Sequence, residues 1–308
     1  MTLDQNFVGI DVSKAYVDVF YERNARLARV PNRAEDLTVF VGALEPASLV
    51  VLEATGRYDR ALCAELERAG VGYVRVNPLR ARDFARAVGQ LAKTDQLDAQ
   101  MLARMGRALA LTPQPQPQAA RERLTSLSRR RDQLVNLRAR EANHAESADP
   151  ESLDSIERHI AWLNQDIEAL DQAITDLIQA DPDLAHANRL LRSTPGVGPV
   201  AATTLLALLP ELGTRSDKAI AALAGLAPLN RDSGTLRGTR HIGPGRSRVR
   251  KALYMAALNA IRCSPRLKAA YLGLRDRGKP AKLALIAIAR KLIVILNAMI
   301  RHHTPFKA

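Results

Sequence analysis

The sequence predicts an α/β N-terminal domain, a helical coiled-coil middle and a mainly α C-terminal domain. Strand-like and helix-like patterns alternate over the first 110 residues, a heptad repeat of apolar residues follows, and helical spacing dominates beyond residue 180. A chain of 308 residues has room for two or three domains and a sizeable core. We expect these domains at 1–112, 113–182 and 183–308.

Each element of the first domain is predicted from its own pattern. The expected strands are Asn6–Val12, Tyr16–Glu22, Arg26–Pro31, Ser48–Glu53 and Tyr73–Asn77, and the expected helices are Ala34–Leu44, Asp59–Ala69, Leu79–Val88 and Asp95–Leu109. Short turns between the first three strands imply antiparallel pairing, and helical crossovers imply parallel pairing. This mixed order is that of the ribonuclease H-like fold, in which the first and fourth strands are neighbours.

Four carboxylates occupy positions that structural reasons alone do not explain. Asp11 and Glu53 end apolar strands that are expected to be neighbours, and Asp95 and Asp98 lie one helical turn apart on a face shared with Leu102. A helix cap would explain Asp95, but neither Asp98 nor Glu53. An unpaired buried carboxylate is costly, whereas Mg²⁺ takes oxygen ligands and bridges substrate phosphates. The four acids therefore predict a two-metal site that acts on nucleic acid.

A spacer and a heptad repeat follow. Thr112–Gln118 alternates proline with other residues, which favours an extended spacer. Helical pattern covers 119–180, with a break at Pro150. Its second half repeats apolar residues at alternating spacings of 4 and 3, namely Ile156, Ile160, Leu163, Ile167, Leu170, Ile174 and Leu177. An antiparallel hairpin within the chain and a coiled coil between subunits both fit this repeat, and both can hold.

The net charge of +13 is concentrated in the C-terminal part. Residues 181–308 contain 22 Lys and Arg against 6 Asp and Glu, whereas residues 1–180 contain 23 against 26. This asymmetry predicts contact with a polyanion, and the alternative is a solubilising basic face. Seven basic residues within 231–251 favour nucleic acid. Because aromatic residues make up only 4%, phosphate contacts rather than base stacking are expected to supply the affinity.

Two glycine-rich segments mark the C-terminal part. Thr194-Pro195-Gly196-Val197-Gly198-Pro199 precedes an apolar helix at Val200–Leu209, which is the helix-hairpin-helix pattern. Its backbone N–H groups could approach a DNA phosphate, although a plain turn between helices fits as well. Further helices are expected at Asp217–Ala224, Ser247–Ile261 and Lys282–Ile300.

The loop over Gly225–Gly245 places Ser233-Gly234 among arginines. A Ser-Gly pair is usually just a turn, but the arginines would favour a phosphate beside the hydroxyl, so Ser233 is a candidate nucleophile. The residues expected to contact nucleic acid are Gly196, Gly198, Arg231, Arg237, Arg240, Arg246 and Arg248.

Other features restrict the setting of the protein. Cys63 and Cys263 are isolated, which fits a reducing cytoplasm and not a disulfide framework. No apolar stretch is expected to reach the length of a membrane span, and no signal peptide opens the chain.

Taken together, the motifs resemble those of the DEDD transposases of bacterial insertion sequences, which are related to the Piv DNA invertases and understood as bridge-RNA-guided recombinases. Each motif is weak alone, and their common order over nearly the whole chain is specific. The motifs are Gly9-Ile10-Asp11-Val12-Ser13-Lys14, Glu53-Ala54-Thr55-Gly56-Arg57-Tyr58, Lys93-Thr94-Asp95 with Leu97-Asp98-Ala99, Pro195-Gly196-Val197-Gly198-Pro199, Ala224-Gly225-Leu226-Ala227-Pro228, Ser233-Gly234, Arg248–Tyr254, and Gly278-Lys279-Pro280 followed by Ala289-Arg290-Lys291-Leu292.

The resemblance implies roles for five residues. Asp11, Glu53, Asp95 and Asp98 would be the metal ligands of a RuvC-like domain, and Ser233 would be the catalytic serine that forms a phosphoserine–DNA intermediate. It also implies Mg²⁺ as cofactor, a guide RNA that pairs with donor and target DNA, and an active site assembled from the subunits of a dimer or tetramer. The implied location is the bacterial cytoplasm, in association with the nucleoid and away from the membrane.

Other functions fit part of the sequence. A RuvC-like nuclease that uses water would need the same four acids. A sugar kinase or actin-like ATPase also opens with an Ile-Asp motif on this type of sheet, but it normally has a glycine just after the aspartate, and Asp11-Val12-Ser13-Lys14 has none. A non-catalytic helix-hairpin-helix module would explain the basic half and leave the four acids unexplained.

Overall fold

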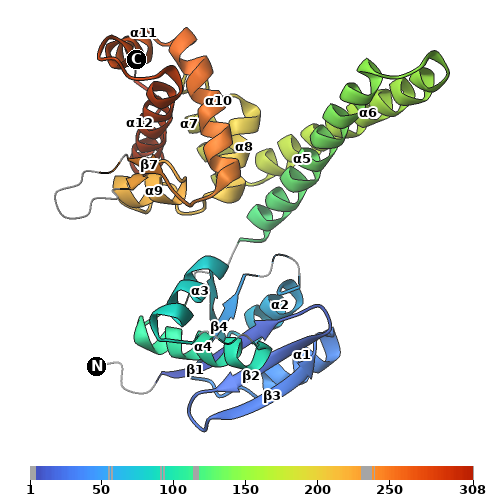
Figure 1. Ribbon diagram of the computed structural model, residues 1–308, viewed down its shortest axis with the longest axis vertical. Coiled ribbons are helices and arrows are strands. Elements are labelled where there is room, and N and C mark those ends of the chain that lie inside the picture. Colours follow the sequence, from blue (N-terminus) through green and yellow to red (C-terminus); the bar gives the residue numbers. More distant parts are fainter. Residues whose placement is uncertain are drawn as a thin grey trace. The chain divides into compact units, whose positions relative to one another are not determined.

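The computed structural model describes residues 5–54, 56, 58–90, 92, 94–113, 118–229, 238 and 240–307. The chain folds as two compact units, Met1–Gln116 and Pro117–Ala308, which we call unit 1 and unit 2 (Figure 1). The three expected domains stay a prediction.

Unit 1 is built on a five-stranded mixed sheet. Its strands lie in the order β3-β2-β1-β4-β5 and are β1 (Asn6–Val12), β2 (Tyr16–Tyr21), β3 (Arg26–Pro31), β4 (Ser48–Glu53) and β5 (Gly72–Val76). The pairs β1–β2 and β2–β3 are antiparallel, whereas β1–β4 and β4–β5 are parallel. The prediction that the first and fourth strands are neighbours is confirmed, as is the mixed α/β class.

Helices cover both faces of this sheet. Val8 and Ile10 of β1 point to one face, where they pack with residues of α1 (Ala34–Gly42) and α2 (Arg60–Arg68). Phe7 and Val51 point to the other face, where they pack against α4 (Asp95–Ala108), and α3 (Pro78–Ala87) contacts α4. Because side chains alternate along a strand, the odd-numbered residues of β1 and β4 face α4.

Helix α4 lies so close to β1 that one strand position has no room for a side chain. A Cβ atom on Gly9 would lie 1.9 Å from the carbonyl oxygen of Ala99 and 2.5 Å from the amide nitrogen of Ala103, both backbone atoms of α4. Further along the helix, a Cβ on Gly106 would lie 2.5 Å from the ring of Phe7. Gly9 and Asp11 point to the same face of β1, so this contact sets the first turn of α4 against the end of β1.

In the part that the structure describes, unit 2 consists of helices and one short ladder. The helices are α5 (Ala119–Glu146), α6 (Pro150–Ala180), α7 (Pro182–Arg192), α8 (Pro199–Leu208), α9 (Asp217–Leu223), α10 (Ser247–Cys263), α11 (Pro265–Asp276) and α12 (Ala281–His302). Helices α5 and α6 pack along each other in the long arm seen in Figure 1. Heptad residues Leu163, Ile167 and Ile174 are buried. A coiled coil between subunits stays a prediction.

Helix α11 and a pair of strands in unit 2 are not among the elements expected from the sequence. Helix α11 could have been predicted from its start: the Ser264 hydroxyl caps it by accepting a 3.4 Å hydrogen bond from the Leu267 N–H, and Pro265 occupies its first turn. Strands β6 (Pro228–Leu229) and β7 (His241–Ile242) lie inside the segment expected to be a loop. Strands of two residues are too short for side-chain periodicity to show.

The expectation that no apolar stretch reaches the length of a membrane span is wrong for α12. This helix is long and apolar enough to span a membrane by length and composition, and 50% of its apolar window is buried inside the protein. Ile288, Leu292 and Leu296 of α12 belong to the core of unit 2. Packing against several neighbouring helices explains why its apolar surface extends so far around it.

The close approach of α4 to β1 yields a testable prediction. Gly9→Ala should destabilise unit 1 by about 1–3 kcal/mol, because the added Cβ meets helix backbone rather than the end of a flexible side chain. Gly42→Ala is the matched control, since nothing lies within 4 Å of a Cβ there. Hydrogen exchange of the α4 amides reports on unit 1 alone, and equal exchange in the two variants would contradict the close packing.

Candidate active site

Three elements bring the four predicted acids to one edge of the sheet. Asp11 lies near the end of β1 and Glu53 ends β4, and the carboxyl ends of these parallel strands meet at the same edge. Because side chains alternate along a strand, Asp11 lies on the same face as Phe7 and Glu53 on the same face as Val51, and α4 covers that face. Asp95 and Asp98 lie in the first turn of α4, which the contact at Gly9 sets against the end of β1.

The four carboxylates share one electrostatic environment. The pKa of Asp11 is raised to about 6, first because its side chain is partly buried and then by the negative charges of Asp98, Asp95, Glu53 and Asp18. Ionised Asp11 is therefore disfavoured in the ion-free protein. A divalent cation would offset this repulsion, and oxygen donors of this kind suit a hard cation such as Mg²⁺.

The side chains do not converge on one point as they stand. Among the residues that the structure describes, no three His, Cys, Asp or Glu side chains form a group that could hold a metal ion. The Asp95 side chain is 58% exposed, and its carboxylate lies 3.6 Å from the guanidinium of Arg29. Glu53 and Asp98 have polar interactions of their own. The four carboxylates suit a divalent cation, because all are oxygen donors and all lie on the same face of the sheet. Binding requires them to turn toward the ion.

The helix cap that could have explained Asp95 is provided by its neighbour. The hydroxyl of Thr94 accepts a 3.3 Å hydrogen bond from the N–H of Leu97, so Thr94 is the cap of α4. Asp95 and Asp98 instead place two carboxylates in the first turn, where the helix dipole favours negative charge.

Two charged residues beside the site are not predicted by the sequence patterns. Asp18 of β2 lies directly opposite Asp11, and Arg29 of β3 lies directly opposite Asp18. Asp18 is only 2% exposed, and both of its carboxylate oxygens accept 3.0 Å hydrogen bonds from Arg29. The sequence signal that could have predicted this pair is Asp18 itself, an acid in the middle of an apolar strand. The pair balances one negative charge next to Asp11 and links β3 to the start of α4 through Asp95.

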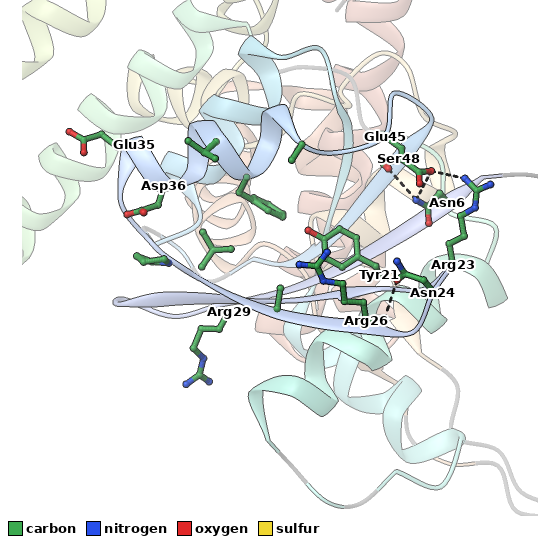
Figure 2. A pocket seen from close by; sticks show the side chains of 16 residues that line it. Asn6, Tyr21, Arg23, Asn24, Arg26, Arg29, Glu35, Asp36, Glu45 and Ser48 are labelled. Atoms are coloured by element: carbon green, nitrogen blue, oxygen red, sulfur yellow. Dashed lines mark hydrogen bonds and ion pairs between the residues drawn. The ribbon is translucent and has the colours of Figure 1, made fainter.

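A cavity of unit 1 lies away from these acids. It measures about 660 Å³ and is lined mainly by residues of α1, of β3 and of the turn between β2 and β3. Figure 2 shows Asn6, Tyr21 and Arg26 lining it, whereas the side chain of Arg29 extends to the opposite side of the sheet. Asn6 alternates with Phe7, so the cavity is on the α1 face. The acids therefore occupy the other face, at the edge beside α4.

The predicted residues of unit 2 have different surroundings. Arg231, Ser233 and Arg237 lie outside the described residues, and Arg240 is exposed beside β7. Gly196 has a φ of 87°, and a Cβ on it would lie 2.4 Å from the amide nitrogen of Ala260 in α10. Gly198 is the exposed N-cap of α8, without a side-chain cap. The close packing against α10 leaves no room for a side chain at Gly196. Contact of Gly196 or Gly198 with a phosphate stays a prediction.

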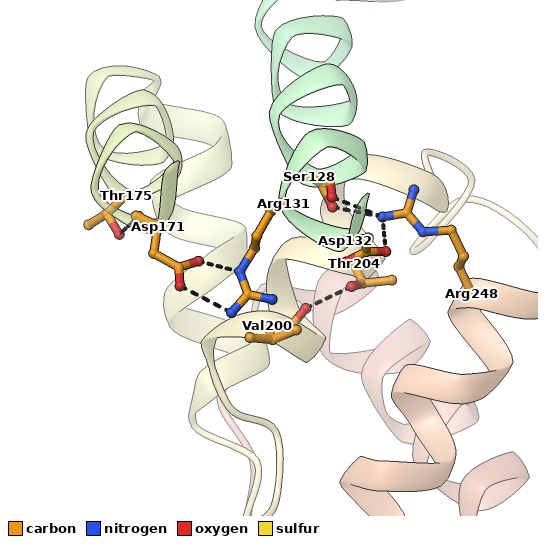
Figure 3. Close-up of polar contacts among 8 residues, drawn as sticks. All are labelled: Ser128, Arg131, Asp132, Asp171, Thr175, Val200, Thr204 and Arg248. Atoms are coloured by element: carbon orange, nitrogen blue, oxygen red, sulfur yellow. Dashed lines mark hydrogen bonds and ion pairs between the residues drawn. The ribbon is translucent and has the colours of Figure 1, made fainter. Parts of the chain in front are cut away.

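Arg246 and Arg248 make ion pairs inside unit 2. Arg246 donates hydrogen bonds of 2.5 and 2.7 Å to the two carboxylate oxygens of Glu211. Burial would raise the pKa of Glu211, but the hydrogen bonds and charge of Arg246 outweigh it, so the pKa is lowered. Arg248 pairs with Asp132 at 2.5 Å and donates 3.2 Å hydrogen bonds to the carbonyl and hydroxyl oxygens of Ser128 (Figure 3). Contact of these arginines with nucleic acid stays a prediction.

The raised pKa of Asp11 predicts a pH-dependent stability. Without metal, folded Asp11 holds its proton up to about pH 6, whereas the unfolded chain loses it near 3.8. Between these values the folded state binds more protons, so its stability falls as the pH rises. In chelator, Asp11→Asn should therefore stabilise unit 1 above pH 6 and lose this advantage below pH 3.8, as measured by α4 hydrogen exchange. Glu35→Gln, an exposed control on α1, should show no such pH-dependent change in stability. Equal stabilisation of unit 1 by Asp11→Asn at every pH would contradict the raised pKa of Asp11.

Comparison with known proteins identifies matches in both units. A DEDD transposase family model of the IS110 type matches residues 8–148, and a second model, described as the transposase IS116/IS110/IS902 family, matches residues 188–272. The chain is 29% identical over 317 residues to the pilin gene-inverting protein of Moraxella bovis, covering 99% of this chain and 98% of that protein. It is 31% identical over 157 residues to the uncharacterized 43.6 kDa protein of insertion element IS110 from Streptomyces coelicolor, covering 50% of this chain and 38% of that protein.

These matches agree with the geometry of unit 1. The first model spans Asp11, Glu53, Asp95 and Asp98, the acids that the sheet edge and α4 bring together. A DEDD transposase domain implies dependence on a divalent metal ion, and a transposase acts on DNA. The chain belongs to the IS110/IS116/IS902 family of transposases and is a DNA transposase or recombinase of the insertion-sequence type.

Proposed function

We propose that this enzyme cleaves and exchanges DNA strands through a phosphoserine intermediate on Ser233, with Mg²⁺ held by Asp11, Glu53, Asp95 and Asp98. The metal assignment is supported by the common edge of β1 and β4 beneath the first turn of α4. There the negative charges of the other three acids help to raise the pKa of Asp11. The serine half is supported by family membership and by the arginines around Ser233 in the sequence.

The acids and the serine would divide the chemistry between them. Two bound Mg²⁺ ions would polarise the scissile phosphate and stabilise charge on the attacking and leaving oxygens. The Oγ of Ser233 attacks the phosphorus, the bond to the 3′ oxygen breaks, and the DNA 5′ end becomes joined to the serine. A DNA 3′-hydroxyl then attacks the phosphoserine and releases Ser233. The phosphodiester energy is kept in the intermediate, so exchange needs no ATP.

The basic C-terminal part would bind the phosphate backbone, and the choice of DNA sequence would fall to a guide RNA. Binding to the phosphate backbone is supported by the charge asymmetry of the chain and by its scarcity of aromatic residues, whereas the guide RNA is implied by the family resemblance alone. The names of its relatives describe gene inversion and insertion elements. We propose that the protein acts on donor and target DNA as a homo-oligomer, a dimer or a tetramer, in association with the bacterial nucleoid.

Removing any one metal ligand should separate cleavage from binding. Asp11→Asn, Glu53→Gln or Asp98→Asn should reduce Mg²⁺-dependent strand cleavage by at least ~10³-fold and leave DNA affinity nearly unchanged, because each variant removes a metal ligand and little surface. Glu35→Gln on α1 is a control that removes one exposed acid from the other face of the sheet. Full recombination by Asp11→Asn in Mg²⁺ would refute the metal assignment.

The serine separates a recombinase from a nuclease that uses water, because both would need the same acids. If Ser233 is the nucleophile, stalled reactions should contain protein joined to a DNA 5′ end, resistant to denaturant and removed by proteolysis. Ser233→Ala should abolish both this adduct and the recombinant product. The substitution should leave folding and RNA binding intact, since the loss of one hydroxyl usually changes stability little. Normal recombination by Ser233→Ala would favour the water-using nuclease.

Mixing two inactive proteins tests whether different subunits supply the acids and the serine. Asp11→Asn retains Ser233, and Ser233→Ala retains the acids. Partial recovery of recombination in mixed oligomers would support an active site shared between subunits. Complete inactivity of the mixture would argue that each subunit uses its own residues.

A further inference from the structure

A cleft of about 270 Å³ lies inside unit 2, where the long arm of α5 and α6 meets the other helices. Its walls come from α5, α6, α7 and the first half of α8. Ile174 and Ile178 of α6 form part of the lining, and polar side chains from all four helices form most of the rest. The cleft therefore suits a ligand that carries polar groups.

The charged residues of the cleft leave one cation without a partner. Arg131 of α5 donates hydrogen bonds of 2.5 and 3.0 Å to the two carboxylate oxygens of Asp171 (Figure 3). Asp132, the other acid that lines the cleft, pairs with Arg248. Both acids are thus neutralised by an arginine. Arg192, in the last turn of α7, forms no ion pair or side-chain hydrogen bond with any residue that the structure describes.

One buried hydroxyl in the cleft is also without a partner. Thr203 of α8 is only 8% exposed, and its hydroxyl makes no hydrogen bond within the described part of the chain. The next residue, Thr204, is equally buried, but its hydroxyl donates a 2.7 Å hydrogen bond to the carbonyl of Val200. A buried polar group without a partner is costly, and a ligand that bonds to it removes this cost. The Thr203 hydroxyl is therefore available to a ligand in the cleft.

The first turn of α8 adds backbone donors at the same place. Its N-cap, Gly198, has no side chain that could accept a hydrogen bond from the N–H groups of this turn, and Pro199 and Val200 line the cleft. The N–H groups of a first turn have no partner within their own helix, and the helix dipole makes this end positive. An unpaired guanidinium, a hydroxyl and a helix N-terminus together suit an anion.

We propose that this cleft binds one phosphate of a nucleic-acid backbone through the guanidinium of Arg192, the hydroxyl of Thr203 and the N–H groups that begin α8. The inference rests on the proposed binding of phosphates by the basic C-terminal part, and it names the place and the residues of one such contact. Phosphate is the anion that a DNA transposase meets on its substrate. Its several oxygens can accept from a side chain of α7 and from α8 at the same time.

This contact lies outside the arginine-rich segment 231–251 of the sequence. Arg246 and Arg248 of that segment are bound to acids of unit 2, so their guanidinium groups are already partnered. Arg192 has no such partner among the described residues and faces a cleft with further donors. The structure therefore favours Arg192 over these two arginines as a phosphate ligand.

The direct test compares Arg192→Met with Arg189→Met, which removes the same charge from an exposed position on α7 that does not line the cleft. Arg192→Met should weaken binding of the full chain to nucleic acid roughly tenfold. It should also reduce the slope of log affinity against log salt by about 0.7–0.9, the contribution of one phosphate contact. Arg189→Met should change both quantities much less.

Two probes identify where the phosphate comes from. Both variants are measured with a duplex DNA and with a single-stranded RNA of the same sequence. A loss of affinity in Arg192→Met for only one of them assigns the cleft to that nucleic acid, and a loss for both assigns it to backbone phosphate of either kind. Equal effects of the two substitutions on both probes would overturn the proposal.

A second pair of variants tests the hydroxyl. Thr203→Val should leave the stability of the free protein unchanged or slightly higher, because the lost hydroxyl has no partner among the described residues. It should weaken nucleic-acid binding roughly 3–10-fold, with an unchanged salt slope because no charge is removed. Thr204→Val should keep normal affinity, since its hydroxyl is already bound to Val200. Equal affinities of these two variants would overturn the role of Thr203.

The outcomes separate this inference from the proposed function. If affinity of the wild-type protein for both probes depends only weakly on salt, the proposed binding of phosphates by the basic C-terminal part fails, and this inference fails with it. If the wild-type slope is steep and Arg192→Met has the same slope and affinity as Arg189→Met, the inference alone is overturned.

Discussion

The close approach of α4 to β1 at Gly9 is the constraint on which unit 1 depends. Because Gly9 has no side chain, the backbone of α4 rests directly on the strand, and Ala99 and Ala103 meet it there. The first turn of the helix consequently lies at the sheet edge where β1 and β4 end. A bulkier residue at Gly9 would separate Asp98 from Asp11 without altering any of the four acids. The site thus depends on a packing contact that contains no polar atom of the site itself.

This arrangement has an electrostatic cost that the protein balances only in part. Partial burial and three neighbouring acids raise the pKa of Asp11, and Asp18 on the adjacent strand adds further negative charge. Arg29 pairs with Asp18 and approaches Asp95, so one arginine serves two acids. The remaining repulsion would be relieved by a bound divalent cation. The charge that disfavours the ion-free state is thus the charge that we propose binds metal.

How far the sequence predicts the structure depends on the range of the interactions. Strand and helix patterns predict the order of unit 1, because side-chain alternation and turn residues act locally. The positions of Asp11 and Glu53 follow from the pairing of the first and fourth strands. The Asp18–Arg29 pair is not predicted, because it depends on the register of β2 against β3. The ion pairs of Arg246 and Arg248 join residues far apart in the chain, so a run of arginines suggests a solvated surface where the structure has internal contacts.

We propose that Asp11, Glu53, Asp95 and Asp98 jointly bind divalent metal ions. The most direct test is anomalous X-ray scattering from crystals of the protein grown with Mn²⁺, which takes oxygen ligands as Mg²⁺ does. The account predicts anomalous density within coordination distance of the carboxylates of Asp11 and Asp98, with Asp18 still bound to Arg29. Density at Asp18 in place of Asp11, or no density beside the first turn of α4, would contradict it.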